Sequence, residues 1–143
     1  MLSRETIRVA CLSSCLLAAV GASEASAQLG QRPADEYIQR MDNPARVERI
    51  RVADVVEAIR LETGDIVADI GSGAGAFSVS MAQAIGPTGT LYAVDIDQEM
   101  IDHVVERAEG EGLTNVRGVL GEYGDPKLPT RDVDVAFLHD TLH

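Results

Sequence analysis

A short apolar run that leads directly into three closely spaced glycines is the feature that most constrains this chain. Residues 66–70 are apolar except for one aspartate and rich in β-branched side chains, which predicts a buried strand, and every second residue of 71–75 is glycine. Beyond the loop, Phe77, Met81 and Ile85 recur at helical spacing. A strand, a bare glycine loop and a helix N-terminus in this order let a ligand approach the backbone and offer free N–H groups to an anion.

The same alternation of short apolar runs and helical patterns continues along the chain. Further strands are expected at residues 90–94, 116–120 and 133–138, with a helix after Asp97, which would be its N-cap. Strands separated by helices of about a dozen residues predict βαβ units, and therefore an α/β fold around a parallel sheet. Aromatic residues make up only 3% of the chain, so the core must be aliphatic, as is typical of helices packed on such a sheet.

Two helical segments are expected before the first strand, within residues 28–63. One covers residues 34–41, and Asn43 followed by Pro44 then has the pattern of an N-cap and a first helical position. The second segment has an apolar stripe at i, i+3, i+4 and i+7, and a Thr-Gly-Asp turn at 63–65 ends it.

Residues 1–27 have the features of an export signal. Two arginines precede an apolar run at 9–20, which is too short for a stable membrane span, and Ala25-Ser26-Ala27 matches a signal peptidase site. We therefore expect a mature chain that begins at Gln28, is periplasmic or secreted and has no membrane span. Three alternatives stay open: an ordinary apolar helix, lipidation at Cys15, or a misassigned start and a cytoplasmic protein.

Charge and cysteine content exclude several functions. The net charge is −11 and Lys127 is the single lysine, so the chain has no basic stripe for nucleic acid. Both cysteines, Cys11 and Cys15, lie in the expected signal segment, which leaves the mature chain without disulfides or thiolate ligands. The three histidines show no convincing metal-ligand spacing, and no metal site is expected.

The glycine loop fits two kinds of cofactor. Gly71, Gly73 and Ala76 also match the G-x-G-x-x-[GA] pattern of dinucleotide-binding proteins. Asp69 favours the other kind, because a carboxylate at the end of a buried strand needs a partner. The positively charged amine of a ligand would be such a partner, whereas a pyrophosphate would be repelled.

The segment 69–75, Asp-Ile-Gly-Ser-Gly-Ala-Gly, resembles motif I of class I S-adenosylmethionine (SAM)-dependent methyltransferases. Residues 92–97 are similar to motif II of that family, residues 121–122 to the motif III region, and residues 134–139 to motif IV, which leads to the reaction centre. The resemblance covers about residues 64–143. It implies a Rossmann-like three-layer α/β/α sandwich with SAM as the cofactor.

The resemblance also implies roles for particular residues. The loop would wrap the methionine part of SAM, Asp95 would take both ribose hydroxyls, Ile96 would pack on the adenine ring and Glu122 would meet the adenine amine. Asp95 lies about 20 residues beyond the loop, as a ribose-binding acid should. The predicted cofactor-binding residues are Asp69, Gly71, Ser72, Gly73, Gly75, Asp95, Ile96 and Glu122. Simpler roles remain open, such as a cap for Asp69 or Asp95 and a solvated loop position for Glu122.

Methyl transfer from SAM depends mainly on positioning, and a side-chain base is needed only when the acceptor must first lose a proton. His139 is a candidate base, although a histidine at a strand end is more often structural. We expect a small-molecule acceptor, and the sequence does not indicate the oligomeric state.

Members of the resembled family have a seven-stranded sheet, and only about four of those strands are expected here. We therefore expect residues 64–143 to be an incomplete SAM-binding domain, truncated after the fourth strand. Two alternatives to an active methyltransferase follow: a nicotinamide-dependent oxidoreductase built on the same loop, and a non-catalytic SAM-binding remnant.

Overall fold

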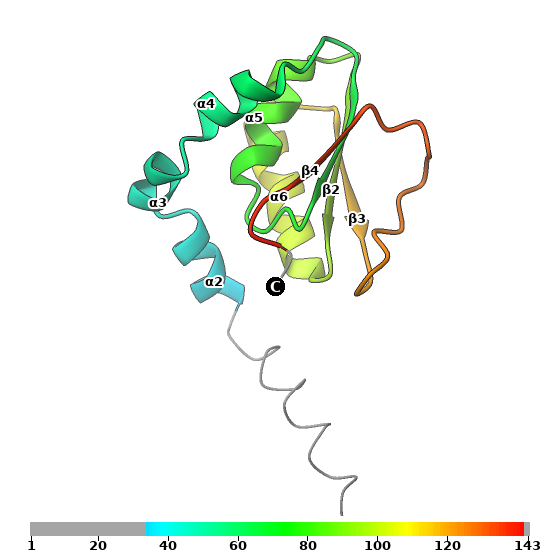
Figure 1. Cartoon of the computed structure of the whole chain (residues 1–143). Helices are drawn as coiled ribbons and strands as arrows, with labels where there is room; N and C mark the ends of the chain where they lie inside the picture. Colours follow the sequence, from blue (N-terminus) through cyan, green and yellow to red (C-terminus); the bar gives the residue numbers. More distant parts are fainter. Residues whose placement is uncertain (1–33, 142–143) are drawn as a thin grey trace, which may run out of the picture. The chain divides into compact units, whose positions relative to one another are not determined.

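The computed structural model describes residues 34–141, and the expected signal peptide, Cys15 and His143 lie outside them. Figure 1 shows three helices at the start of this part of the chain, after which strands and helices alternate as far as Leu120. In chain order the elements are α2 (Ala34–Met41), α3 (Pro44–Arg49), α4 (Val52–Ile59), β1 (Ile66–Ile70), α5 (Ala76–Ile85), β2 (Thr90–Asp95), α6 (Gln98–Gly110), β3 (Val116–Leu120) and β4 (Val135–Leu138).

The four strands form one parallel sheet in the order β3-β2-β1-β4. The chain moves outward from β1 through β2 to β3, and then returns to place β4 on the other side of β1. Ile70, the last residue of β1, is in register with Val94 of β2 and Leu138 of β4. The carboxyl ends of the three strands therefore meet at one edge, at the point where the strand order reverses, which is where open α/β sheets bind ligands.

The core lies between the sheet and the helices α4, α5 and α6, which Figure 1 shows packed together. Alternate residues of the strands point toward these helices, because side chains along a strand alternate between its two faces. Each aliphatic side chain fully buried there stabilises the fold by roughly 1.5–3 kcal/mol. The largest fully buried apolar side chains are those of Val67, Met81, Ile85, Leu91 and Val104.

The predicted α/β, Rossmann-like fold with a parallel sheet is confirmed. The strand at 66–70 has the predicted bounds, and Asp97 caps α6 by accepting a hydrogen bond from the Glu99 amide. The fourth strand begins at Val135, two residues later than the pattern predicted. Within residues 34–141, helices α4, α5 and α6 share one core cluster with the sheet, and the connection between β3 and β4 contains no helix.

The expectation of one continuous helix after Pro44 is wrong. Asn43 caps α3 as predicted, its side chain accepting a hydrogen bond from the Ala45 amide. However, Arg51 has a φ of 51° and separates α3 from α4, and Arg60, with a φ of 59°, ends α4 before the expected turn at 63–65. The apolar stripe could not reveal this break, because its residues, Val52, Val55, Val56 and Ile59, all lie within α4 and say nothing about the chain before it.

Candidate functional site

The loop between β1 and α5 needs glycine at two positions for different reasons. Gly71 has a φ of 76°, and a Cβ there would lie only 2.3 Å from the Thr141 Oγ1. Gly75 has a φ of 78°, and a Cβ there would lie 2.8 Å from a methyl group of Val104 in α6. Both positions combine a left-handed backbone with a close neighbour, so a side chain at either one would displace the loop.

Asp95, at the end of β2, is bound to this loop. The Gly73 amide donates to Asp95 Oδ2 at 2.9 Å, and the Asp97 amide donates to Asp95 Oδ1 at 3.1 Å. The amides of Gly71 and Ser72 both donate to the carbonyl of Val94. The carboxylate predicted to bind ribose therefore faces the glycine loop, with its orientation set by two backbone N–H groups.

Asp69 is a buried carboxyl group whose one hydrogen-bond partner in the described part of the chain is Ser78. The residue is 3% exposed, and the Ser78 hydroxyl on α5 donates to its Oδ2 at 2.5 Å. Burial raises the pKa of Asp69 from 3.8 to about 6, since the charged form loses its hydration; the Ser78 hydrogen bond lowers this pKa and the nearby charge of Asp95 raises it. A cationic group beside Asp69 would restore its ordinary ionisation.

A cavity of about 870 Å³ opens at the carboxyl ends of β1, β2 and β4. Most of the predicted cofactor-binding residues border it, although they come from separate segments of the chain. Those bordering the cavity are Asp69, Gly71, Ser72, Gly73, Asp95, Ile96 and Glu122. Gly75 does not border it, because it is buried against Val104 and serves the packing of the loop.

Ile96 and Ser72 have the surroundings expected of ligand-binding groups. The Ile96 side chain is an exposed large apolar group on the cavity wall, with 61% of its surface accessible. The Ser72 Oγ is buried and has no hydrogen-bond partner among the described residues. Buried hydroxyls are rarely left in this state, so a polar ligand group at the loop would satisfy Ser72.

Glu122 lies on the cavity wall within a small charged turn. Its backbone is hydrogen-bonded in both directions to Asp125, and its carboxylate lies 3.2 Å from the Lys127 ammonium, which also pairs with Asp125. The side chain is 70% exposed, as in the solvated position considered from the sequence. Tyr123 follows it and is 91% exposed beside the same cavity.

His139 borders the cavity at the end of β4, but its ring also belongs to an aromatic cluster. It lies 4.9 Å from the ring of Phe77 and is stacked with Phe137 at 6.4 Å and 7°. The imidazole therefore combines packing against the core with access to the cavity.

Three cavity residues carry no signal in the sequence. Tyr37 and Met41 of α2 and Arg46 of α3 line the cavity although they precede the glycine loop by 25 residues or more. No motif surrounds them, and only the folding of the N-terminal helices against α6 and the glycine loop brings them there. Within residues 34–141 no cluster of three or more histidine, cysteine or acidic side chains is placed to hold a metal ion.

Comparison with known proteins agrees with this site. The family described as "Methyltransferase domain" matches residues 67–143, which is more than half of the chain. The chain belongs to this methyltransferase domain family. The matched segment includes the glycine loop, Asp95 and His139.

Individual relatives are similar over shorter stretches. A protein-L-isoaspartate O-methyltransferase of Ignicoccus hospitalis is 35% identical over 71 residues, covering 50% of this chain and 34% of the relative. A Sulfolobus acidocaldarius protein with the name "Probable cobalt-precorrin-6B C(15)-methyltransferase (decarboxylating)" is 33% identical over 110 residues, covering 76% and 57%. The crystal structure of a SAM-dependent methyltransferase from Aquifex aeolicus matches with a TM-score of 0.67 and 30% identity, over 76% of this chain and 57% of that chain.

The chain thus spans between about a third and three fifths of the length of the relatives it matches. No helix of residues 34–141 is long and apolar enough to cross a bilayer.

Proposed function

We propose that this protein is a SAM-dependent methyltransferase. The observation that supports it most directly is the meeting of Asp69, the glycine loop and Asp95 around one cavity at the switch point of the sheet. Family membership and the SAM-dependent relative from Aquifex aeolicus support the same cofactor.

The residues present fit such a cofactor. The buried Asp69, with its raised pKa, and the unsatisfied Ser72 Oγ would both be stabilised by a polar ligand. The amino-acid end of SAM has a cationic amine that could pair with Asp69. Asp95 would hold the ribose hydroxyls, Ile96 would pack on the adenine ring and Glu122 would accept from the adenine amine. A pyrophosphate in place of the amine would instead be repelled by ionised Asp69, which disfavours a nicotinamide cofactor.

The chemistry that SAM supplies is a methyl group on a sulfonium, already activated for in-line displacement. The protein has to hold the donor, exclude water and align the acceptor, and positioning of this kind can lower a barrier by up to roughly 7–11 kcal/mol. His139 borders the cavity and is our candidate for a base, in case the acceptor must lose a proton before attack.

The acceptor we propose is a small molecule. The cavity of about 870 Å³ has a size typical of small-molecule sites. Among the relatives, one name specifies a cobalt-precorrin and another a protein isoaspartate, so similar proteins are named for both kinds of acceptor.

We further propose that the protein is exported, with cleavage after Ala27. The support is the basic start, the apolar run and the Ala-Ser-Ala site of residues 1–27. Mass spectrometry of the protein from a periplasmic extract would test it: a mature N-terminus at Gln28 is expected, and an intact Met1 in the cytoplasm would contradict it.

Titration calorimetry of the purified full chain tests the cofactor assignment. S-adenosylhomocysteine should bind, and Asp95→Ala should lower its affinity by at least about tenfold, because the ribose loses a charge-assisted hydrogen-bond acceptor. Asp132→Ala, an exposed acidic residue away from the cavity, is the control with equal charge change. Binding of NAD in preference to S-adenosylhomocysteine would instead indicate an oxidoreductase.

A further inference from the structure

The cavity that we assign to SAM is lined by acidic side chains and contains one permanent cation. Five of its lining residues have carboxyl groups, whereas Arg46 is the sole arginine or lysine among the lining residues of the described chain. The carboxylates of Glu122 and Asp125 already pair with Lys127, which leaves the others facing the site. Arg46 therefore provides a positive charge within a lining that is otherwise mainly acidic.

The Arg46 guanidinium is only weakly engaged by the protein. It makes a single hydrogen bond, to the carbonyl of Met41 at 3.3 Å, and within residues 34–141 no carboxylate lies within 4 Å of it. A guanidinium has five N–H donors, arranged so that two can meet a carboxylate side by side. A half-buried arginine in this state has unused donors beside a cavity.

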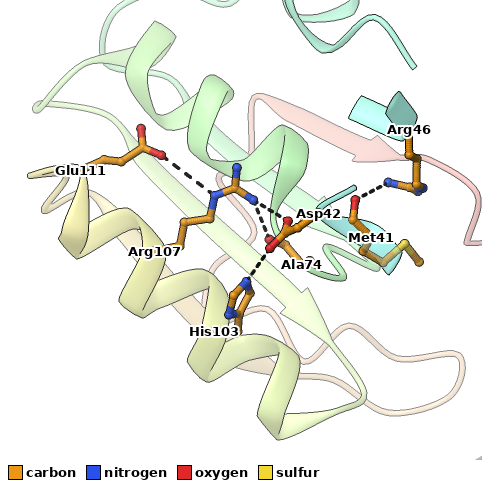
Figure 2. A network of polar contacts seen from close by, with 7 residues as sticks. All are labelled: Met41, Asp42, Arg46, Ala74, His103, Arg107 and Glu111. Atoms are coloured by element: carbon orange, nitrogen blue, oxygen red, sulfur yellow. Dashed lines mark hydrogen bonds and ion pairs between the residues drawn. The ribbon is translucent and has the colours of Figure 1, made fainter. Parts of the chain in front are cut away.

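The backbone around Arg46 is anchored to the cofactor loop. Figure 2 shows Asp42, at the junction of α2 and α3, contacting two side chains of α6: it accepts from Arg107 at 2.8 Å and lies 3.0 Å from His103 Nε2. The same Arg107 nitrogen donates to the Ala74 carbonyl in the glycine loop at 3.2 Å. The start of α3 is thus held against the loop, and this fixes where Arg46 enters the cavity.

We propose that Arg46 is an anion-binding residue of this cavity and that it takes a carboxylate. The inference rests on the proposed function. Two molecules could supply the group: the amino-acid end of the cofactor, whose carboxylate is its one anionic group, or an acidic acceptor. A carboxylate is preferred to a phosphate because the remaining charges of the site are acidic and would repel a second negative charge.

The first arm of the test compares two ligands in calorimetry on the full chain. S-adenosylhomocysteine has the carboxylate, whereas 5′-methylthioadenosine has the same nucleoside and sulfur but no amino-acid group. If the cofactor supplies the carboxylate, Arg46→Met should lower the affinity for S-adenosylhomocysteine by about tenfold or more and leave the affinity for 5′-methylthioadenosine unchanged. Arg46→Lys should restore part of the affinity.

The second arm uses benzoate as a simple acidic probe on protein saturated with S-adenosylhomocysteine. If the acceptor supplies the carboxylate, wild type should bind benzoate, the Arg46→Met variant should not, and both should bind S-adenosylhomocysteine equally. Benzamide, which has the same shape without the charge, is the control ligand.

Arg49→Met is the matched control variant, because Arg49 is exposed on the same helix, does not line the cavity and has the same charge. The thermal midpoint of each variant shows whether it folds. Equal affinities of wild type and Arg46→Met in both arms would overturn the inference, as would an equal loss for both nucleosides. Failure of wild type to bind either nucleoside would instead refute the proposed function itself.

Discussion

Asp69 lies at the buried end of β1, where folding places a carboxyl group among apolar side chains. Its pKa of about 6 lies above the ordinary value of 3.8, so the folded protein binds this proton more tightly than the unfolded chain does. The stability contributed by the proton is fully present below about pH 3.8 and is lost as the pH rises through about 6. At neutral pH the ionised group costs the fold about 3 kcal/mol, from about 1.36 kcal/mol for each pKa unit.

We therefore expect Asp69→Asn to raise the free energy of unfolding at pH 7.5 by up to about 3 kcal/mol, and to leave it nearly unchanged at pH 4. Ser78→Ala should lower the free energy of unfolding at pH 7.5, because it removes the hydrogen bond that lowers the pKa of Asp69. Urea denaturation from pH 4 to 8 measures both. Parallel curves for wild type and Asp69→Asn over this range would show that Asp69 is not titrating as described.

The same carboxyl group should make cofactor binding depend on pH. A cationic amine beside Asp69 favours its ionised form, so affinity for S-adenosylhomocysteine should rise as the pH increases from 5 to 7.5. In the Asp69→Asn variant, calorimetry should show a weaker affinity and a flatter pH profile. An identical profile in the two proteins would place the ligand amine away from Asp69.

At the scale of elements, the glycine loop fixes how α5 leaves β1 and how closely α6 approaches it. Gly75 is the contact point, since a side chain there meets Val104 in the core. The glycine at the end of α6, Gly110, differs because no heavy atom lies within 4 Å of a Cβ added there and its φ is negative.

Substitution of these two glycines by alanine should therefore have opposite effects. Gly75→Ala combines a left-handed φ with a 2.8 Å clash, and we expect it to lower the free energy of unfolding by about 1–3 kcal/mol or more. Gly110→Ala should raise it by about 0.5–1 kcal/mol through helix propensity. Equilibrium urea unfolding measures both values, and a neutral Gly75→Ala would mean that the loop can move away from α6.

At the scale of the whole molecule, one polar network connects the N-terminal helices to the α/β unit. Asp42, His103 and Arg107 join the α2–α3 junction to α6, and Arg107 also reaches the loop at Ala74 (Figure 2). The side chains of Asp42 and Arg107 are about 30% exposed, so the pair is neither fully buried nor fully screened by solvent. Through this network α2 and α3 contribute Tyr37, Met41 and Arg46 to the cavity.

A double-mutant cycle of Asp42→Asn and Arg107→Met should give a coupling energy of roughly 0.5–2 kcal/mol. Hydrogen exchange of the α2 amides should become faster in each single variant, because the tether of that helix is lost. As a control, Arg51→Met removes the exposed Arg51–Asp54 pair at the start of α4 and should leave α2 exchange unchanged. Additive effects of the Asp42 and Arg107 changes would show that the pair does not hold the helices.

Local pattern was enough to predict much of this protein. The strand at 66–70, the loop that follows it and the caps at Asn43 and Asp97 all depend on residues close in sequence. Hydrophobic periodicity predicts the strand, glycine spacing predicts the loop, and short polar side chains predict the helix caps. The chain alone therefore determined the α/β class and a glycine loop suited to a nucleoside cofactor.

Only the tertiary structure decided what surrounds that loop. The packing of His139 on Phe77 and the entry of Arg46 into the cavity both depend on contacts between distant segments. The pKa of Asp69 depends in the same way on burial and on Asp95, 26 residues away in the chain. Burial and charge are set by what packs against a residue in space, and the spacing of residues along the chain does not contain that information.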